Sequence, residues 1–220
     1  MSALIGAAIG AVLQVAIALL LAGAGWGVAR GIERFRDRDR TPFTRWLGLL
    51  PTGRPAWHLG VVVLAAAALG VGLTLAGHAL IPGYDTIVAG PEAPYGKVAR
   101  LGSAPVVIAG ALLYAFIQTG LSEEILFRGV VARRLVSWLG FDVGNTAQAL
   151  LFVGIHNAML LSLTDASPWL HVHVFVMVGT LSWCAGWLME RWFNGSLVGA
   201  WMAHAGANLG TCLTVWALIA

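Results

Sequence analysis

Long apolar runs recur along the chain and are separated by short polar segments. A membrane-spanning helix needs about 20 apolar residues, and six runs reach that length. They predict six spans, at Leu4–Val28, Trp57–Ile81, Ala104 to about Arg134, Val143–Leu163, Trp169–Met189 and Ser196–Ile219. The expected fold class is therefore an all-α, polytopic membrane helix bundle of about six transmembrane helices, within a range of roughly six to eight.

The third run stays apolar to Leu121 and then continues with charged but helix-forming residues to Arg134. Pro105 falls in its first turn, where proline is tolerated, and no later proline interrupts it. The pattern predicts one long or slightly broken helix. Charged residues therefore continue a helix that begins as an apolar span.

Composition supports a membrane protein and excludes several other classes. Of the 220 residues, 59% are hydrophobic and 10% are charged, whereas a soluble domain carries about 25% charged residues. A soluble globular enzyme, a disordered chain and a nucleic-acid-binding protein are all excluded on this basis. Cys184 and Cys212 lie in apolar stretches, which favours buried thiols over a disulfide or a metal cluster. We expect one membrane domain over residues 1–220.

The distribution of arginine predicts an orientation. The segment Arg30–Arg54 holds seven arginines, so the positive-inside rule places it in the cytoplasm. The segment from Pro82 to about Ser103 is expected to be a loop on the outer side, because its charges cancel. Six spans then put both chain ends outside. The predicted location is a multi-pass protein of a bacterial or archaeal plasma membrane.

Two adjacent carboxylates close the apolar part of the third run, in Glu123-Glu124-x-x-x-Arg128. An ionisable residue inside a span is costly and marks a functional site by default. Glu124 and Arg128 are four residues apart, which favours an ion pair on one helix face. Glu123 points about 100° away and has no such partner, so it is a candidate general base. The competing interpretation is a solvated, inert pair at the membrane rim.

Two further polar pairs lie within predicted spans. Phe152 and His156 are four residues apart on the fourth span, and His204 and Asn208 are four apart on the sixth. Taken alone, His156 is better explained as a hydrogen-bonded core histidine. The small residues between His204 and Asn208 equally favour a helix-packing seam. All three motifs, however, lie roughly 12 to 20 Å from the cytoplasmic ends of their spans, so they could share one cavity.

Such a cavity allows two routes to amide hydrolysis. In one, Glu123, His156 and His204 hold a zinc ion that keeps an open position for water. In the other, Glu123 deprotonates water directly with help from His156, while His204 and Asn208 donate hydrogen bonds to the oxyanion. Residue types and spacing do not choose between these routes. Zinc is the one cofactor that this residue set suggests.

The three motifs, in this order, resemble those of the CPBP family of CAAX-processing and bacteriocin-processing (Abi) membrane proteins. The family pattern is Glu-Glu-x-x-x-Arg, then Phe-x-x-x-His, then His-x-x-x-Asn or Asp. It is met by Glu123-Glu124-x-x-x-Arg128, Phe152-x-x-x-His156 and His204-x-x-x-Asn208. The resemblance covers about residues 104–220, the expected catalytic core. It leaves residues 1–103 as an expected two-helix accessory part.

The resemblance implies an intramembrane endopeptidase, with its site nearer the cytoplasmic side. In this family Glu123 would activate water with His156 assisting, His204 and Asn208 would stabilise the oxyanion, and Glu124, Arg128 and Phe152 would support the site. The eukaryotic and archaeal branch cuts after a prenylated cysteine, whereas bacterial relatives have varied roles. The implied partners are the lipid bilayer and a membrane-protein or lipidated-peptide substrate, with no nucleic acid.

Two non-proteolytic functions remain as alternatives. One is a non-catalytic immunity or binding protein that sequesters a membrane-active peptide. The other is a small transporter that uses Glu123 as a proton relay. The transporter is the weakest hypothesis, because the outer halves of the third, fourth and sixth spans contain no further acidic residue.

Overall fold

The computed structural model describes residues 2–35, 41–163 and 166–220, and every regular element in these ranges is a helix. An all-α membrane architecture is therefore confirmed. The long single helices are α1 (Ser2–Phe35), α3 (Trp57–Leu80), α9 (Phe141–Leu163), α10 (Pro168–Trp187) and α11 (Leu197–Ile219). Shorter helices are α2 (Phe43–Leu47), α4 (Tyr84–Val88), α5 (Pro94–Ala99) and the π-helical turn η3 (Leu188–Trp192), which continues α10.

The third predicted span is one continuous helix, but its winding changes along its length. It consists of α6 (Ala104–Leu112), η1 (Leu113–Leu121), α7 (Ser122–Glu124), η2 (Ile125–Ala132) and α8 (Arg133–Leu139). The segments η1 and η2 are π-helical, a wider winding in which bonds reach five residues back and which is frequent at functional sites. The sequence predicted the continuity and not the π-helical winding.

Five helical segments of the described chain are long and apolar enough to cross a membrane: Ala3–Arg34, Trp57–Leu80, Ala104–Leu139, Pro168–Trp192 and Leu197–Ile219. Helix α9 forms where the fourth span was expected, yet it is not one of these five. It carries polar residues at Asn145, Gln148, His156 and Asn157. A sixth span and the orientation of the bundle stay predictions.

Three local expectations need correction or delimitation. The segment expected as an outer loop contains the short helices α4 and α5. Cys212 is buried as expected, but Cys184 is exposed, and both thiols are free. Residues 36–40 of the arginine-rich segment, and residues 164 and 165 between the fourth and fifth predicted spans, lie outside the described residues.

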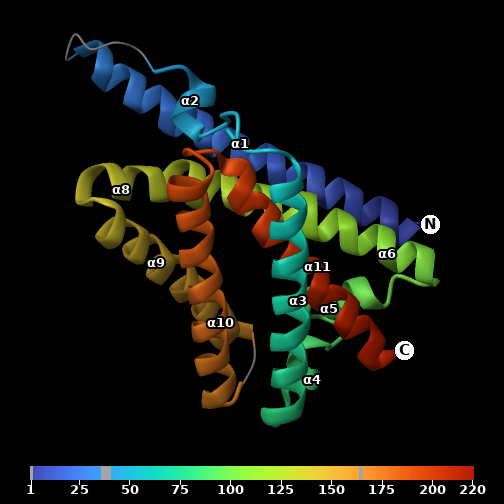
Figure 1. Ribbon diagram of the computed structural model, residues 1–220. Helices are drawn as coiled ribbons and strands as arrows, with labels where there is room; N and C mark the ends of the chain where they lie inside the picture. The colour runs from blue at the N-terminus through green and yellow to red at the C-terminus, as the bar shows by residue number, and fades with distance from the viewer. Residues whose placement is uncertain (1, 36–40, 164–165) are drawn as a thin grey trace.

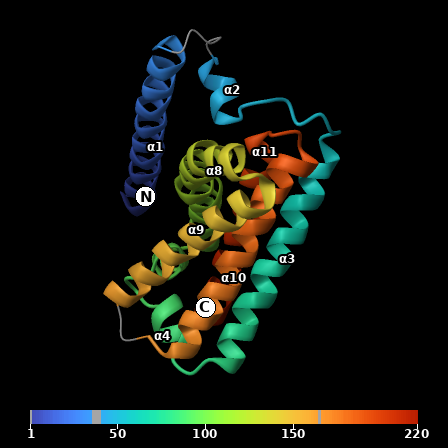
Figure 2. The same cartoon turned by 90° about the vertical axis from the view of Figure 1, so that its left-hand side faces the viewer.

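Most of the long helices fall into two packed groups. Helix α11 packs along α3 and against η1 and α5, while α9 packs against α10 and α8. Helices α3 and α10 run beside each other in both views but touch at few places (Figures 1 and 2). Helix α1 lies along η1 and η2 and presents many large apolar side chains outward, which suits contact with lipid.

Glycines bring the backbones of α3 and α11 into direct contact. A methyl group added at Gly70 would collide with the carbonyl oxygen of Ala207. Methyl groups at Gly206 and Gly210 would likewise meet backbone oxygens of α3. Small residues at such an interface allow the close approach on which helix association in membranes depends. Because α11 carries His204 and Asn208, its close packing against α3 positions that half of the candidate site.

This contact predicts unequal effects for two glycines on α3. Gly70→Ala should destabilise the detergent-solubilised protein by about 1–3 kcal/mol, because the new methyl group overpacks a backbone contact. Gly72→Ala is the matched control, since nothing lies within 4 Å of a methyl group at that position. Thermal unfolding midpoints measure the difference. Equal midpoints for the two variants would contradict the assigned packing.

Candidate active site

The three polar motifs come together from three parts of the bundle. Glu123 lies on α7, His156 on α9 and His204 on α11. The Oε2 atom of Glu123 is 4.0 Å from Nε2 of His156 and 3.8 Å from Nε2 of His204. Residues far apart in the chain thus meet around one carboxylate, as the similar depths of the motifs had suggested.

Glu124 and Arg128 form the ion pair that their spacing predicted. The Oε1 atom of Glu124 is 2.7 Å from Nη1 of Arg128, and the side chains are 0% and 2% exposed. A solvated pair at the membrane rim is therefore the wrong interpretation. The guanidinium also lies 4.7 Å from the ring centre of Phe152 and donates from Nη2 to the Ser182 carbonyl at 3.2 Å. Two buried charges of opposite sign are each stabilised mainly by the other.

Hydrogen bonds fix how both imidazoles are turned. Nδ1 of His156 is 2.8 Å from the Phe152 carbonyl oxygen, and Nδ1 of His204 is 2.8 Å from Oε1 of Glu124. A carbonyl or carboxylate oxygen accepts, so each Nδ1 donates its hydrogen. Both Nε2 atoms are left to face Glu123. Phe152 thus supports the site twice, through its carbonyl and through its ring, whose centre lies 4.4 Å from that of His156.

Asn208 is held at both ends of its amide. Its Nδ2 donates to Oγ1 of Thr119 at 2.8 Å, and its Oδ1 accepts from the hydroxyl of Tyr95 at 3.0 Å. Sequence reasoning missed both partners. Thr119 precedes the glutamate pair by about one helical turn, and this spacing could have predicted that Thr119 lies on the same face of the helix. Tyr95 belongs to the segment expected to be a loop, and no local pattern singles it out.

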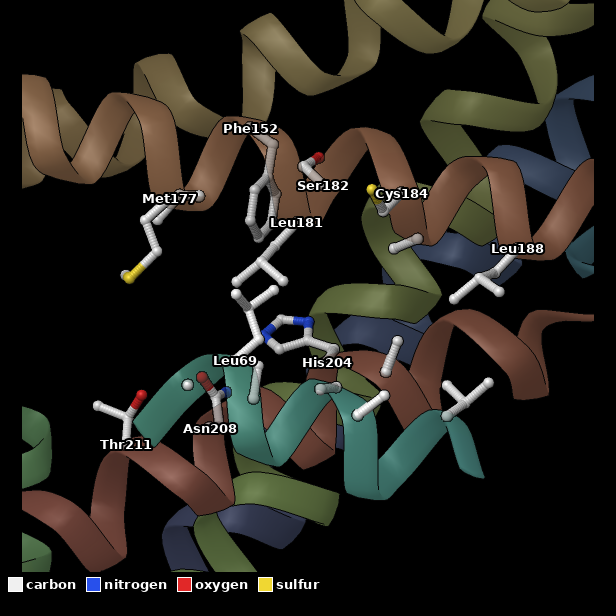
Figure 3. A pocket seen from close by; sticks show the side chains of 18 of the residues that line it. Leu69, Phe152, Met177, Leu181, Ser182, Cys184, Leu188, His204, Asn208 and Thr211 are labelled. Atoms are coloured by element: carbon white, nitrogen blue, oxygen red, sulfur yellow. The ribbon is translucent and has the colours of Figure 1, made fainter. Parts of the chain in front are cut away.

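A cavity of about 320 Å³ opens beside these residues, within the range of small-ligand sites. His156, His204 and Asn208 line it, whereas Glu123 is not among its lining residues. In Figure 3, His204 and Asn208 lie on one side and Phe152 and Leu181 face them from the other. The walls are mainly apolar side chains: Val62, Ala65, Ala66 and Leu69 from α3, and Met177, Val178, Leu181, Ala185 and Leu188 from α10 and its continuation.

The fit of a zinc ion depends on both chemistry and spacing. Two imidazoles whose Nδ1 atoms bond to oxygens, with Nε2 directed inward, match zinc ligands and their usual supporting bonds. Two ligand atoms on a tetrahedral zinc ion, however, lie about 3.4 Å apart. The distances here are 3.8 and 4.0 Å, and the described residues contain no cluster of three or more His, Cys, Asp or Glu side chains that could hold a metal ion. As arranged, these residues do not fit zinc.

Residues 105–210 match the family model described as type II CAAX prenyl endopeptidase Rce1-like. The chain carries an Rce1-like protease domain. This match agrees with the resemblance seen in the three motifs, all of which lie inside it. Comparisons with curated proteins and with solved structures found no significant match.

The Rce1-like domain is completed by residues outside the match. Helix α3 supplies part of the cavity wall, and Tyr95 on α5 bonds directly to Asn208. Both elements precede residue 105. The N-terminal part therefore contributes side chains to the candidate active site of the Rce1-like domain.

The buried pair predicts that Arg128 is required for stability. Arg128→Met should cost about 3–5 kcal/mol, because Glu124 would remain as a buried charge without its guanidinium partner. Lys97→Met is the control, since the Lys97–Glu92 pair, 3.1 Å apart, is solvent-exposed and should contribute little. Unfolding in detergent compares the two. A fully stable Arg128→Met protein would show that the buried pair is dispensable.

Proposed function

We propose that this protein hydrolyses a peptide bond of a prenylated, CAAX-type protein or peptide at a site within the membrane. Membership of residues 105–210 in a family of prenyl endopeptidases supports a protease of this kind. The observation that carries the proposal is a carboxylate, Glu123, facing two imidazole Nε2 atoms within 4.0 Å. This cluster adjoins an apolar cavity in a membrane protein.

Glu123 is the proposed general base. Its Oε2 is buried and has no hydrogen-bond partner among the described protein groups. Distances of 3.8 and 4.0 Å to the two imidazoles are too long for direct hydrogen bonds, and a small movement of the Glu123 side chain towards the cavity would admit a bridging water. Such a water can give a proton to Glu123 while it attacks the peptide carbonyl. His156 offers Nε2 as a second acceptor that orients the water.

His204 and Asn208 are the proposed oxyanion donors. With hydrogens on both ring nitrogens, His204 donates from Nε2 to the oxyanion and from Nδ1 to Glu124, 2.8 Å away. Asn208 uses one Nδ2 hydrogen on Thr119 and keeps the second for the oxyanion. Preorganised donors of this kind act strongly in a site with little water.

The cavity supports the proposal that the substrate carries a lipid. Its walls on α3 and α10 are mainly apolar, whereas α9 and α11 add the polar side chains of His156, His204 and Asn208. An apolar chain can occupy the walls while the peptide bond next to it reaches the histidines. A free, polar peptide would lack the first of these interactions and should bind more weakly.

Glu123→Gln should lower cleavage of a farnesylated CAAX peptide by at least about a hundredfold, because the amide cannot take a proton from water. The purified variant should remain folded and should still bind the peptide. Glu92→Gln, on an exposed loop, is the control and should retain full activity. Mass spectrometry of the peptide termini reads out cleavage. A wild-type protein that binds the peptide without cutting it would instead support the immunity or binding function.

Chelation tests the zinc route separately. We expect cleavage to continue in the presence of 1,10-phenanthroline, because the spacing of Glu123, His156 and His204 does not fit a tetrahedral ion. The inactive isomer 1,7-phenanthroline serves as the control. Loss of activity with the chelator alone, restored by added zinc, would assign the reaction to a metal-bound water.

A further inference from the structure

A tyrosine outside the family-matched region is bonded to a candidate oxyanion donor. Tyr95 lies on α5, ten residues before the matched region begins at residue 105. Its side chain lines the same cavity as Asn208, and its hydroxyl is 3.0 Å from the Oδ1 atom of Asn208. No motif in the sequence assigns a function to this residue.

The surrounding hydrogen bonds determine which way the Asn208 amide points. The hydroxyl of Thr119 donates to the Tyr114 carbonyl at 3.0 Å, so its oxygen can only accept from Asn208. Nδ2 of Asn208 therefore faces Thr119, and Oδ1 faces Tyr95. The phenol of Tyr95 must then be the donor in the remaining bond. Burial raises the pKa of Tyr95, so the phenol keeps its hydrogen at neutral pH.

Short-range packing holds Tyr95 in place. A methyl group at Gly96 would collide with the carbonyl oxygen of Gly90, so α5 is pressed against the chain before it. At the C-terminal end of α5, Arg100 donates a hydrogen bond to the Ala89 carbonyl at 2.6 Å, which fixes that end of the helix. The Tyr95 ring meets the Tyr114 ring edge to face, with centres 5.6 Å apart. The hydroxyl is thus presented to Asn208 from a fixed position.

We propose that Tyr95 is a positioning residue, which holds Oδ1 of Asn208 so that the free Nδ2 hydrogen is directed at the oxyanion. Without the phenol hydroxyl, the Thr119 hydroxyl can rotate and donate to Oδ1. The amide can then turn over and present its oxygen where a donor is needed. The N-terminal part of the chain would in this way act on the reaction through Asn208, without contacting the reacting atoms.

This inference rests on the proposed function, and its test uses the same farnesylated CAAX peptide. Tyr95→Phe should lower kcat about tenfold and leave KM within about twofold, because a preorganised donor is lost and the cavity wall is kept. In an Asn208→Ala background the same change should have no further effect. Tyr84→Phe, a buried tyrosine on the other short helix of this connection, is the matched control and should behave as wild type.

The outcomes separate the inference from the function on which it rests. If wild type cleaves the peptide but Tyr95→Phe keeps its kcat, Tyr95 does not position the amide. A rise in KM alone would make Tyr95 a substrate contact, and an additive loss with Asn208→Ala would show that it acts independently. Restoring a donor with 4-aminophenylalanine at position 95 should recover kcat, and failure to do so in a folded protein would overturn the proposal. An inactive wild type would instead count against the proposed function.

Discussion

The buried carboxylate of Glu124 is the interaction on which the rest of the site depends. One oxygen contacts both the Arg128 guanidinium at 2.7 Å and Nδ1 of His204 at 2.8 Å. A carboxylate in an apolar interior is stable only with such partners. Through Arg128 it is linked to the Ser182 carbonyl on α10, and through His204 to α11. A single charge therefore connects three helices and turns one imidazole towards Glu123.

Around this centre, polar side chains replace the apolar packing expected inside a bundle. Gln148 is fully buried and donates to the Ser182 carbonyl at 3.1 Å, and Asn145 donates to the Trp183 carbonyl at 2.9 Å. These bonds join α9 to α10 beside Arg128. Hydrogen bonds between helices fix their relative rotation more sharply than apolar contacts do. The lower apolarity of α9 is thus explained by its polar contacts with α10.

The sequence predicted the helical class, the continuity of the third helix and the Glu124–Arg128 pair, because each follows from local periodicity or spacing. It also suggested that the three motifs lie at similar depths in the membrane. It did not predict the partners of Asn208, since contacts such as Tyr95–Asn208 join residues far apart in the chain. Nor did it predict that Gly70 brings α3 onto α11, because a glycine in a span carries no signal of which helix it meets.

The helix is π-helical on both sides of Glu123 and Glu124, so the number of residues in it determines where these two carboxylates point. A π-helical stretch contains more residues per turn than an α-helix, so it resets the direction in which every later side chain points. Removing one residue from Leu113–Leu121 would rotate the remainder of the helix by somewhat less than the roughly 100° per residue of an α-helix and carry the carboxylates away from the histidines. The number of residues in η1 is therefore as much a part of the site as the identity of its side chains. The length of the helix thus sets both the depth of the two carboxylates and the direction in which they point.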